Sequence, residues 1–267
     1  MKKIVGMLLA VLLLAGCGGR AGTGLGGTVN TDGSTSMADV MAALQEAFRE
    51  KESGVTVNYS GTGSGSGIEA ALRGTCDIGL SSRELKEEEK AQGAVGHTVA
   101  LDGVAVIVNP LNPISDLTVE ELALIFTGEI SSWSQLGGGA GSIAVYGREA
   151  GSGTRGAFEE LLGVEDRCAY TNEYSSTGDV VGSVASNPNA IGYTSLSAVD
   201  GTVAALKIGG AVCTEDTVRD GTYPIQRPFL LVTREGAELS EESRAFLDFA
   251  LSEAAAPYIA KAGAVAP

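Results

Sequence analysis

Short apolar segments alternate with amphipathic segments along most of the chain. Strand-like runs occupy residues 55–60 (VTVNYS), 77–81 (DIGLS), 104–109 (VAVIVN) and 142–147 (SIAVYG), and each is followed by a segment with helical periodicity. Strands that alternate with helices are typical of α/β proteins, in which helices cover the faces of a sheet. The sequence therefore predicts an α/β fold.

The best-defined helix is predicted from Ser36 to about Lys51. Apolar side chains recur there at helical spacing and share one face, namely Met37, Val40, Met41, Leu44, Ala47 and Phe48. Ser36 and Asp39 have the spacing of a capping box, which marks the start of a helix. Comparable starts are predicted at Ser66, Ser81 and Thr118, and the glycines expected to end these helices are Gly74, Gly93 and Gly128.

The N-terminal segment has the features of an export signal. A basic start (MKK) precedes an apolar stretch, residues 4–15, that is too short to span a bilayer as a mature helix. The closing tetrapeptide LAGC (14–17) resembles a bacterial lipobox, whose cysteine is lipidated and becomes the mature N-terminus. An ordinary signal peptide with an incidental cysteine is the alternative. We predict a signal peptide over 1–16, a lipid anchor at Cys17 and a glycine-rich tether over 17–27, which would hold the protein on the outer face of the bacterial cell membrane.

The charge balance excludes some classes of partner. The chain has 18 Lys and Arg against 33 Asp and Glu, a formal net charge of −15, and no basic stripe that could follow a phosphodiester backbone. Nucleic acid is therefore not expected as a partner. His97 is the one histidine, so a histidine-rich metal site is not expected either, and we predict no metal and no cofactor.

Three cysteines follow the predicted signal peptide and its lipid-anchor cysteine, namely Cys76, Cys168 and Cys213, and none has the CxxC spacing of a zinc or redox site. An odd number in an exported chain allows one disulfide and one free thiol. We predict a disulfide between Cys168 and Cys213 and expect Cys76 to be a small buried apolar side chain.

Serine, threonine and glycine concentrate at four predicted strand-to-helix junctions. These are 32–36 (DGSTS), 61–67 (GTGSGSG), 81–83 (SSR) and 151–154 (GSGT). A helix start presents free backbone N–H groups and the positive end of the helix dipole, and hydroxyl groups add donors, so it can bind an oxyanion without a lysine. Each junction alone is also an ordinary cap or turn. Four together favour an anion site.

Familiar nucleotide-binding and hydrolase motifs are absent from the sequence. It contains no Gly-Lys dipeptide, which excludes a Walker A loop, and residues 61–67 do not fit GxGxxG in any register. No serine stands in a GxSxG elbow, and His97 is the only imidazole that could assist a nucleophile. We therefore do not expect an enzyme.

Eight segments, in order across residues 28–250, resemble the extracytoplasmic phosphate-binding proteins of bacterial phosphate ABC importers. They are GSTSM (33–37), NYSGTGSGSG (58–67), DIGLSSREL (77–85), ALDGVAVIVNP (100–110), LIFTGEISSW (124–133), YGREAGSGTR (146–155), NPNAIGYTSL (187–196) and YPIQRPFLLVT (223–233). The most specific piece is REAGSGTR with IFTGEISSW upstream of it.

This resemblance implies a periplasmic-binding-protein-like fold, with two α/β lobes joined by a two-strand hinge and the ligand cleft between them. Lobe one would comprise 28–102 plus 228–267, and lobe two 103–227. The implied function is high-affinity binding of inorganic phosphate by a monomer and its delivery to the permease subunits of an ABC importer. Two alternatives stay open, namely binding of another tetrahedral oxyanion such as sulfate or molybdate, and an adhesion or sensing role on the same fold.

The resemblance also implies which residues bind the ion. Arg148 would hold two phosphate oxygens with its planar guanidinium, and Arg155 would lie behind the site. The other implied ligands are N–H and hydroxyl donors from both lobes, namely Ser34, Thr35, Ser36, Ser64, Ser152, Gly153 and Thr154.

One position departs from the family pattern. Some members carry an aspartate after the third strand that accepts a hydrogen bond from protonated phosphate, whereas this chain has Ser82 followed by Arg83. We expect Asp102 to take the acceptor role, because only a protonated anion can donate to a carboxylate. A hinge or capping role for Asp102 is the alternative. Ser82 joins the expected ligands, and Arg83 either contacts the ion or pairs with a neighbouring acid.

Overall fold

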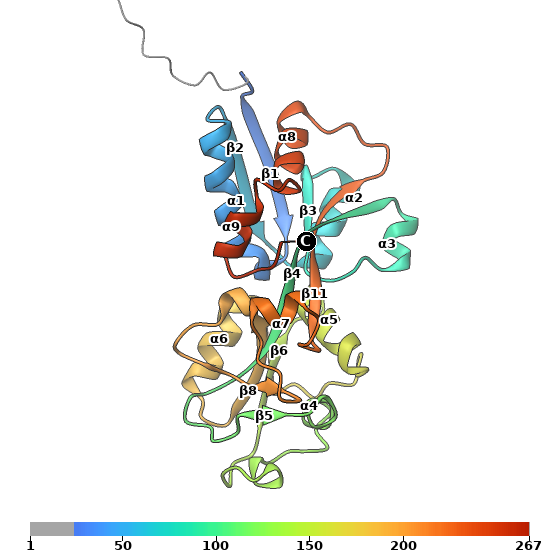
Figure 1. Ribbon diagram of the computed structural model, residues 1–267. Coiled ribbons are helices and arrows are strands. Elements are labelled where there is room, and N and C mark those ends of the chain that lie inside the picture. Colours follow the sequence, from blue (N-terminus) through green and yellow to red (C-terminus); the bar gives the residue numbers. More distant parts are fainter. Residues whose placement is uncertain (1–23, 267) are drawn as a thin grey trace, which may run out of the picture.

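The structure, a computed structural model, describes residues 24–266. The predicted signal peptide over 1–16 and the predicted lipid anchor at Cys17 lie outside the described residues, as does most of the tether. Figure 1 shows two units of mixed helix and strand, connected by two long strands. Helices pack beside strands in both units, which confirms the α/β prediction.

The first unit alternates strands and helices and also contains the last two helices of the chain. Its elements are β1 (Gly27–Gly33), the 3-10 helix η1 (Thr35–Met37), α1 (Ala38–Lys51), β2 (Val55–Gly61), α2 (Ser64–Arg73), β3 (Ile78–Ser81), α3 (Glu87–Ala91), α8 (Glu241–Ala250) and α9 (Ala256–Lys261). β1 pairs in parallel with β2 and with β3. The loops that follow these three strands therefore meet at one edge of the sheet, where open α/β sheets bind their ligands.

The second unit lies in the middle of the chain. Its elements are β5 (Asp116–Leu117), α4 (Val119–Phe126), η2 (Trp133–Leu136), β6 (Ala144–Arg148), α5 (Gly153–Leu162), β7 (Asn172–Tyr174), α6 (Thr177–Ser186), β8 (Ala190–Ser195), η3 (Leu196–Ala198), β9 (Ala204–Ala205), β10 (Lys207–Ile208) and α7 (Glu215–Arg219). β6 pairs in parallel with β7 and β8, and its carboxyl end leads into α5.

Two antiparallel strands, β4 (Ala94–Val108) and β11 (Gln226–Arg234), join the units (Figure 1). β4 pairs with β11 along residues 94–103 and with β8 along residues 104–108, so it belongs to both units. The strand order β2-β1-β3-β11-β4-β8-β6-β7 makes one sheet that runs through the whole molecule.

Each unit has its own main apolar core. The core of the first unit draws on residues 29–100 and 229–264, and the core of the second on residues 104–225 with Val265. Two independent cores joined by two strands can move relative to each other as rigid bodies. We call the units lobe one and lobe two, and we keep the boundaries predicted from the sequence, 102/103 and 227/228, as a proposal.

Most predicted elements are present with shifted ends. The strands predicted at 55–60, 77–81 and 142–147 correspond to β2, β3 and β6, and the predicted first helix to η1 followed by α1. Thr118 caps α4 as predicted, since its Oγ1 accepts a hydrogen bond from the Glu121 N–H at 3.1 Å.

Three predicted helix starts are wrong, because tertiary contacts override the local pattern. No helix starts at Ser81: its buried Oγ donates to the Arg83 carbonyl at 2.9 Å, and α3 begins only at Glu87. No side chain caps η1, α1 or α2, so the capping box predicted at Ser36 is absent, and α2 begins at Ser64 and not at Ser66. The strand predicted at 104–109 is confirmed as the end of β4, whose first part, paired with β11, was not predicted.

The predicted disulfide between Cys168 and Cys213 is also wrong, and both residues are free thiols, as is Cys76. Their surroundings differ: Cys213 packs beside Gly103 of β4, whereas Cys168 Sγ lies 3.9 Å from the Val164 carbonyl. Burial raises the pKa of Cys213 to about 12 and that of Cys168 to about 11. Both thiols therefore stay protonated, and chemically inert, at neutral pH.

Candidate anion-binding site

Four serine hydroxyls of lobe one form a continuous hydrogen-bonded chain at the carboxyl edge of β1, β2 and β3. Ser36 Oγ lies 2.9 Å from Ser34 Oγ, Ser34 Oγ donates to Ser82 Oγ at 2.8 Å, and Ser82 Oγ lies 3.3 Å from Ser64 Oγ. All four side chains are buried. The three parallel strands thus bring together residues from three separate junctions, as their Gly/Ser content predicts.

The helix starts of lobe two close directly onto this serine cluster. Thr154 of α5 donates to Ser36 Oγ at 3.4 Å, and Thr177 Oγ1 at the start of α6 lies 3.1 Å from Thr35 Oγ1. Gly153 is packed against Ser64 and Ser82 so closely that a β-carbon at this position would overlap Ser64 Oγ. The two lobes are therefore in contact across the cluster.

Several helix N-termini point into the cluster. η1 and α2 have no side-chain cap, although the Met37 N–H of η1 donates to the Ser34 carbonyl at 3.3 Å and the Gly65 N–H of α2 donates to the Gly151 carbonyl at 3.0 Å. Ser152 caps α5, because its Oγ accepts from the Arg155 N–H at 3.4 Å, which leaves its own hydroxyl proton as a donor. The positive ends of these helix dipoles favour an anion.

Arg148, the last residue of β6, is a buried cation at the same place. Its guanidinium donates to the carbonyls of Tyr174 (3.1 Å) and Ser175 (2.7 Å) and to Thr177 Oγ1 (3.0 Å). The side chain is 1% exposed, and it forms no salt bridge with a carboxylate of residues 24–266. A buried charge without a counter-charge is costly, so this guanidinium favours an anion beside it.

The charges around Arg148 also favour a bound anion. Burial lowers the pKa of Arg148, Tyr193 and Glu149 raise it, and the positive charge of Arg227 lowers it further. An arginine keeps its proton at neutral pH regardless of such shifts. Arg227 is paired with Asp102, so Arg148 is the buried cation of the site without a carboxylate partner in residues 24–266, and a bound anion would neutralise it.

A network behind the site fixes the backbone of Arg148. Its N–H donates to Tyr193 Oη at 3.1 Å, and Arg155 donates to its carbonyl at 3.1 Å. Arg155 also pairs with Glu159 and Glu173, both at 2.8 Å. Arg155 thus lies behind the site, as expected.

Asp102 does not have the expected role of a free acceptor. Its Oδ2 accepts from Arg227 Nη2 at 2.8 Å and from Nε at 3.0 Å, while its Oδ1 accepts from Ser195 Oγ at 2.7 Å and the Leu196 N–H at 3.2 Å. A carboxylate has about four acceptor positions, and all four are occupied here. Asp102 is a hinge residue, which was the alternative, because Arg227 on the neighbouring strand engages it.

Arg83 is also turned away from the serine cluster. Its two terminal nitrogens donate to the two Glu89 oxygens at 2.8 and 2.7 Å, a bidentate pair that is largely buried. The second alternative, pairing with a neighbouring acid, therefore holds, and Arg83 leaves the set of candidate ligands.

This pair predicts a pH-dependent contribution to stability. Burial tends to raise the pKa of Glu89, but the bonds from Arg83 and the Lys86 N–H outweigh it, so that the pKa lies below its ordinary value of 4.5. A lowered folded-state pKa means that the stabilisation is present above pH 4.5 and is lost as the pH falls through the folded value. We expect Glu89→Gln to reduce the free energy of unfolding by urea at pH 7, by an amount that shrinks toward pH 3.

The matched control is Glu88→Gln, which removes the neighbouring charge from an exposed carboxylate 3.8 Å from Lys86. It should leave the free energy of unfolding nearly unchanged at both pH values. Equal effects of the two substitutions at pH 7 would contradict this account of the Arg83–Glu89 pair.

Sequence reasoning missed Arg227 and Thr177. Arg227 contacts Ser36 Oγ at 3.1 Å and the Ser82 carbonyl at 3.1 Å from β11, and Thr177 bonds both Arg148 and Thr35. Signals for both were available: Arg227 stands inside the segment YPIQRPFLLVT, and Thr177 follows Ser176, whose hydroxyl caps α6.

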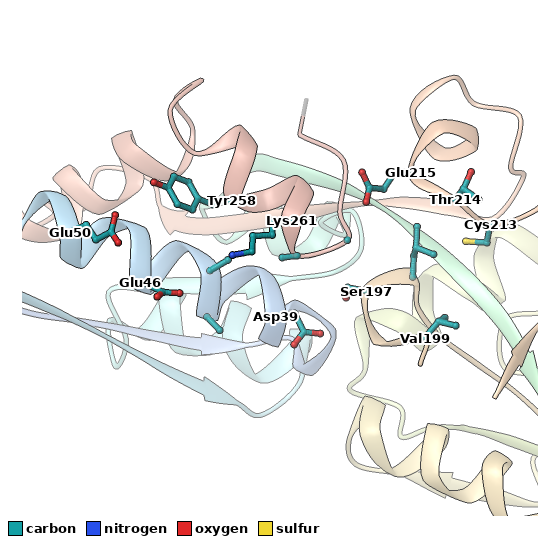
Figure 2. A pocket seen from close by; sticks show the side chains of 15 residues that line it. Asp39, Glu46, Glu50, Ser197, Val199, Cys213, Thr214, Glu215, Tyr258 and Lys261 are labelled. Carbon is teal, nitrogen blue, oxygen red and sulfur yellow. The ribbon is translucent and has the colours of Figure 1, made fainter. Parts of the chain in front are cut away.

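A large open groove lies elsewhere between the lobes. Figure 2 shows that α1 and α9 of lobe one form one side of it, while residues of η3 and α7 form the other. Its volume is about 870 Å³, and it shares none of its lining with the serine cluster. Four carboxylates, those of Asp39, Glu46, Glu50 and Glu215, surround it with Lys261 between them. This excess of negative charge disfavours an anion, so the groove is not the anion site.

Two further searches cover residues 24–266. They contain no cluster of three or more His, Cys, Asp or Glu side chains that could hold a metal ion. None of the helices in this range is both long enough and apolar enough to cross a membrane.

Comparisons with known proteins agree with this architecture. A family model described as a PBP superfamily domain matches residues 18–254. The phosphate-binding protein PstS of Bacillus subtilis is 33% identical over 94% of this chain and 89% of its own length, and PstS of Borreliella burgdorferi is 27% identical over 94% of both chains.

Two solved structures are similar over nearly the whole fold. One, described as a phosphate ABC transporter substrate-binding protein with bound phosphate from Clostridium perfringens, has 40% identity and a TM-score of 0.87 over 90% of this chain and 100% of that one. An ABC-type phosphate transport receptor from Vibrio cholerae has 34% identity and a TM-score of 0.73 over the same shares. These matches confirm the periplasmic-binding-protein-like fold. The chain belongs to the PBP superfamily and, within it, to the family of PstS phosphate-binding proteins.

Proposed function

We propose that this protein binds inorganic phosphate between its two lobes and delivers it to the permease subunits of an ABC importer. The relatives named phosphate-binding protein PstS, and the similar structure with bound phosphate, support the proposal. The observation that carries it is Arg148, a buried guanidinium without a carboxylate partner in residues 24–266, which donates to Thr177 Oγ1, and Thr177 in turn contacts Thr35 of lobe one.

The donors suit a tetrahedral dianion. Arg148 offers a planar guanidinium, and the hydroxyl groups of Ser36, Ser64 and Thr154 lie together at the helix starts, where they can turn from one another to donate to an anion. Hydrogen bonds to a charged group contribute about 1.5–3 kcal/mol each, so several together provide tight binding despite the net charge of −15. Surface carboxylates beyond the Debye length of about 8–10 Å are largely screened.

Binding and release require the lobes to separate. The cluster residues are buried, so an ion can enter or leave only when α5 and α6 move away from Ser36 and Ser64. β4 and β11 are the two strands that cross between the lobes, and bending them would open the cleft.

The remaining parts of the proposal concern the setting of the protein. A monomer anchored by a lipid at Cys17 to the outer face of the cell membrane would present phosphate to the importer from outside. The protein would act as a receptor and not as an enzyme, because the groups around the ion are the ones that hold it and no separate nucleophile or metal site accompanies them in residues 24–266.

Calorimetric titration tests the proposal. Purified protein is unfolded and refolded to remove carried ligand, then titrated with phosphate and, separately, with sulfate and molybdate. We expect one phosphate per chain, bound with sub-micromolar affinity and not displaced by excess sulfate. Preferential binding of sulfate or molybdate would show that this anion, and not phosphate, is the substrate. Binding of none of the three anions would contradict a transport role.

A further inference from the structure

Asp102 and Arg227 form an enclosed ion pair at the point where the two crossing strands meet. They are direct neighbours in the β4–β11 register, and their side chains are 0% and 1% exposed. Asp102 is held from the other side by Ser195 and the Leu196 N–H of lobe two. The pair therefore has a defined position relative to both lobes.

Arg227 connects this pair to the anion site. Its Nε and Nη2 donate to Asp102 Oδ2. In addition, its Nη1 donates to the Ser82 carbonyl and its Nη2 donates to Ser36 Oγ, both at 3.1 Å. Ser36 and Ser82 belong to different loops of the serine cluster. A single planar side chain on the hinge thus sets the positions of two loops that face the ion.

Arg227 also determines which way the hydroxyl groups point. A guanidinium can only donate, so Ser36 Oγ must accept from it. Ser34 donates its one proton to Ser82, so in the Ser36–Ser34 contact the proton comes from Ser36. The protons of Ser36 and Ser34 are therefore both directed along the chain toward Ser82 and away from Arg227, so Arg227 sets the direction of the hydrogen-bonded chain.

We propose that Arg227 is a positioning residue for anion binding, which acts through Ser36, and that Asp102 serves to fix Arg227. This inference rests on the proposed function of phosphate binding. Arg227 fixes the Ser36 and Ser82 loops before the ion arrives, and a preordered site loses less entropy on binding than a mobile one. Asp102 keeps Arg227 from turning toward the ion and neutralises its charge.

A double-mutant cycle tests the coupling between Arg227 and Ser36. Phosphate affinity is measured by calorimetry in the wild type, in Ser36→Ala, in the charge-neutral pair variant Asp102→Asn/Arg227→Gln, and in the combination of all three changes. We expect about a ten- to hundredfold loss in Ser36→Ala and in the pair variant. The combined variant should bind phosphate only slightly more weakly than the weaker-binding of these two variants.

The matched control is Asp216→Asn/Arg219→Gln, which removes an Asp–Arg pair of 2.6 Å from the exposed surface of α7. It should bind phosphate like the wild type. Losses that multiply in the combination, or wild-type affinity in the pair variant, would overturn the inference while leaving phosphate binding intact. Failure of the wild type to bind phosphate would instead overturn the proposed function, and the inference with it.

Arg227→Lys covers the case in which the pair variant does not fold. An ammonium group can pair with Asp102 but cannot also reach Ser36 and the Ser82 carbonyl in the planar arrangement of the guanidinium. We expect this variant to bind phosphate at least tenfold more weakly, with the loss absent in the Ser36→Ala background. Wild-type affinity in Arg227→Lys would contradict the positioning role.

Discussion

Replacing Arg148 by methionine is expected to reduce phosphate affinity by at least about a hundredfold. The substitution keeps the apolar stem of the side chain but removes the guanidinium, and two hydrogen bonds to an anion at about 1.5–3 kcal/mol each correspond to roughly 10²–10⁴ in the dissociation constant. Calorimetric titration measures the loss directly. Phosphate at the same concentration should also raise the melting temperature much less, because the stabilisation by a ligand grows as RT ln(1 + [L]/Kd) and the variant has the larger Kd.

Two companion variants show whether geometry or charge is responsible. Arg148→Lys keeps the charge without the planar pair of donors, so we expect an intermediate affinity. Arg73→Met removes one exposed cation of α2, which pairs with Glu69, and should leave the affinity unchanged. Near-normal phosphate binding by Arg148→Met would exclude Arg148 as the principal ligand and would remove the main support for the proposed site.

The second large effect is expected for Gly153→Ala. A β-carbon at this position would overlap Ser64 Oγ and would lie 2.8 Å from Ser64 Cβ and 2.8 Å from Ser82 Oγ. These neighbours belong to the other lobe, so the clash prevents closure without disturbing the packing inside either lobe. Because the ion needs donors from both lobes, we expect phosphate binding to fall below detection in calorimetry.

A shape measurement separates blocked closure from misfolding. Small-angle scattering should show that wild-type protein becomes more compact when phosphate is added, whereas Gly153→Ala keeps the larger radius. The matched control is Gly182→Ala in α6, where no atom lies within 4 Å of the added β-carbon. It should close and bind normally and be slightly more stable, since alanine favours a helix. Normal compaction of Gly153→Ala would show that the lobes tolerate the added carbon.

Local sequence pattern predicted those parts of the site that lie at strand-to-helix junctions. Ser34, Ser64 and Gly153 were expected near the ligand because helix starts offer donors to an anion and because the resemblance to phosphate-binding proteins implies these positions. The structure brings them into contact. Nothing beyond each junction and the resemblance was needed, so these residues could be found without coordinates.

Charged side chains were harder to assign, because their partners depend on the packing. Asp102 and Arg227 are 125 residues apart in the chain and become neighbours only when β4 pairs with β11. From the sequence alone, Arg83 could pair equally well with a bound anion or with the Glu89 carboxylate. The path of residues 82–86 in the fold places Arg83 against Glu89. The free thiols of Cys168 and Cys213 follow from packing in the same way.

The sequence by itself determined the α/β class, the approximate positions of the predicted strands and the cap of α4 at Thr118, and it predicted the loops that we propose to supply hydroxyl and N–H donors. Those properties arise from periodicity and backbone capping within a few residues. The tertiary structure alone decided that Arg148 is buried without a carboxylate partner among the described residues and that Asp102 is occupied by Arg227. Coulomb interactions and desolvation depend on distances between residues far apart in the chain, which only the folded arrangement defines.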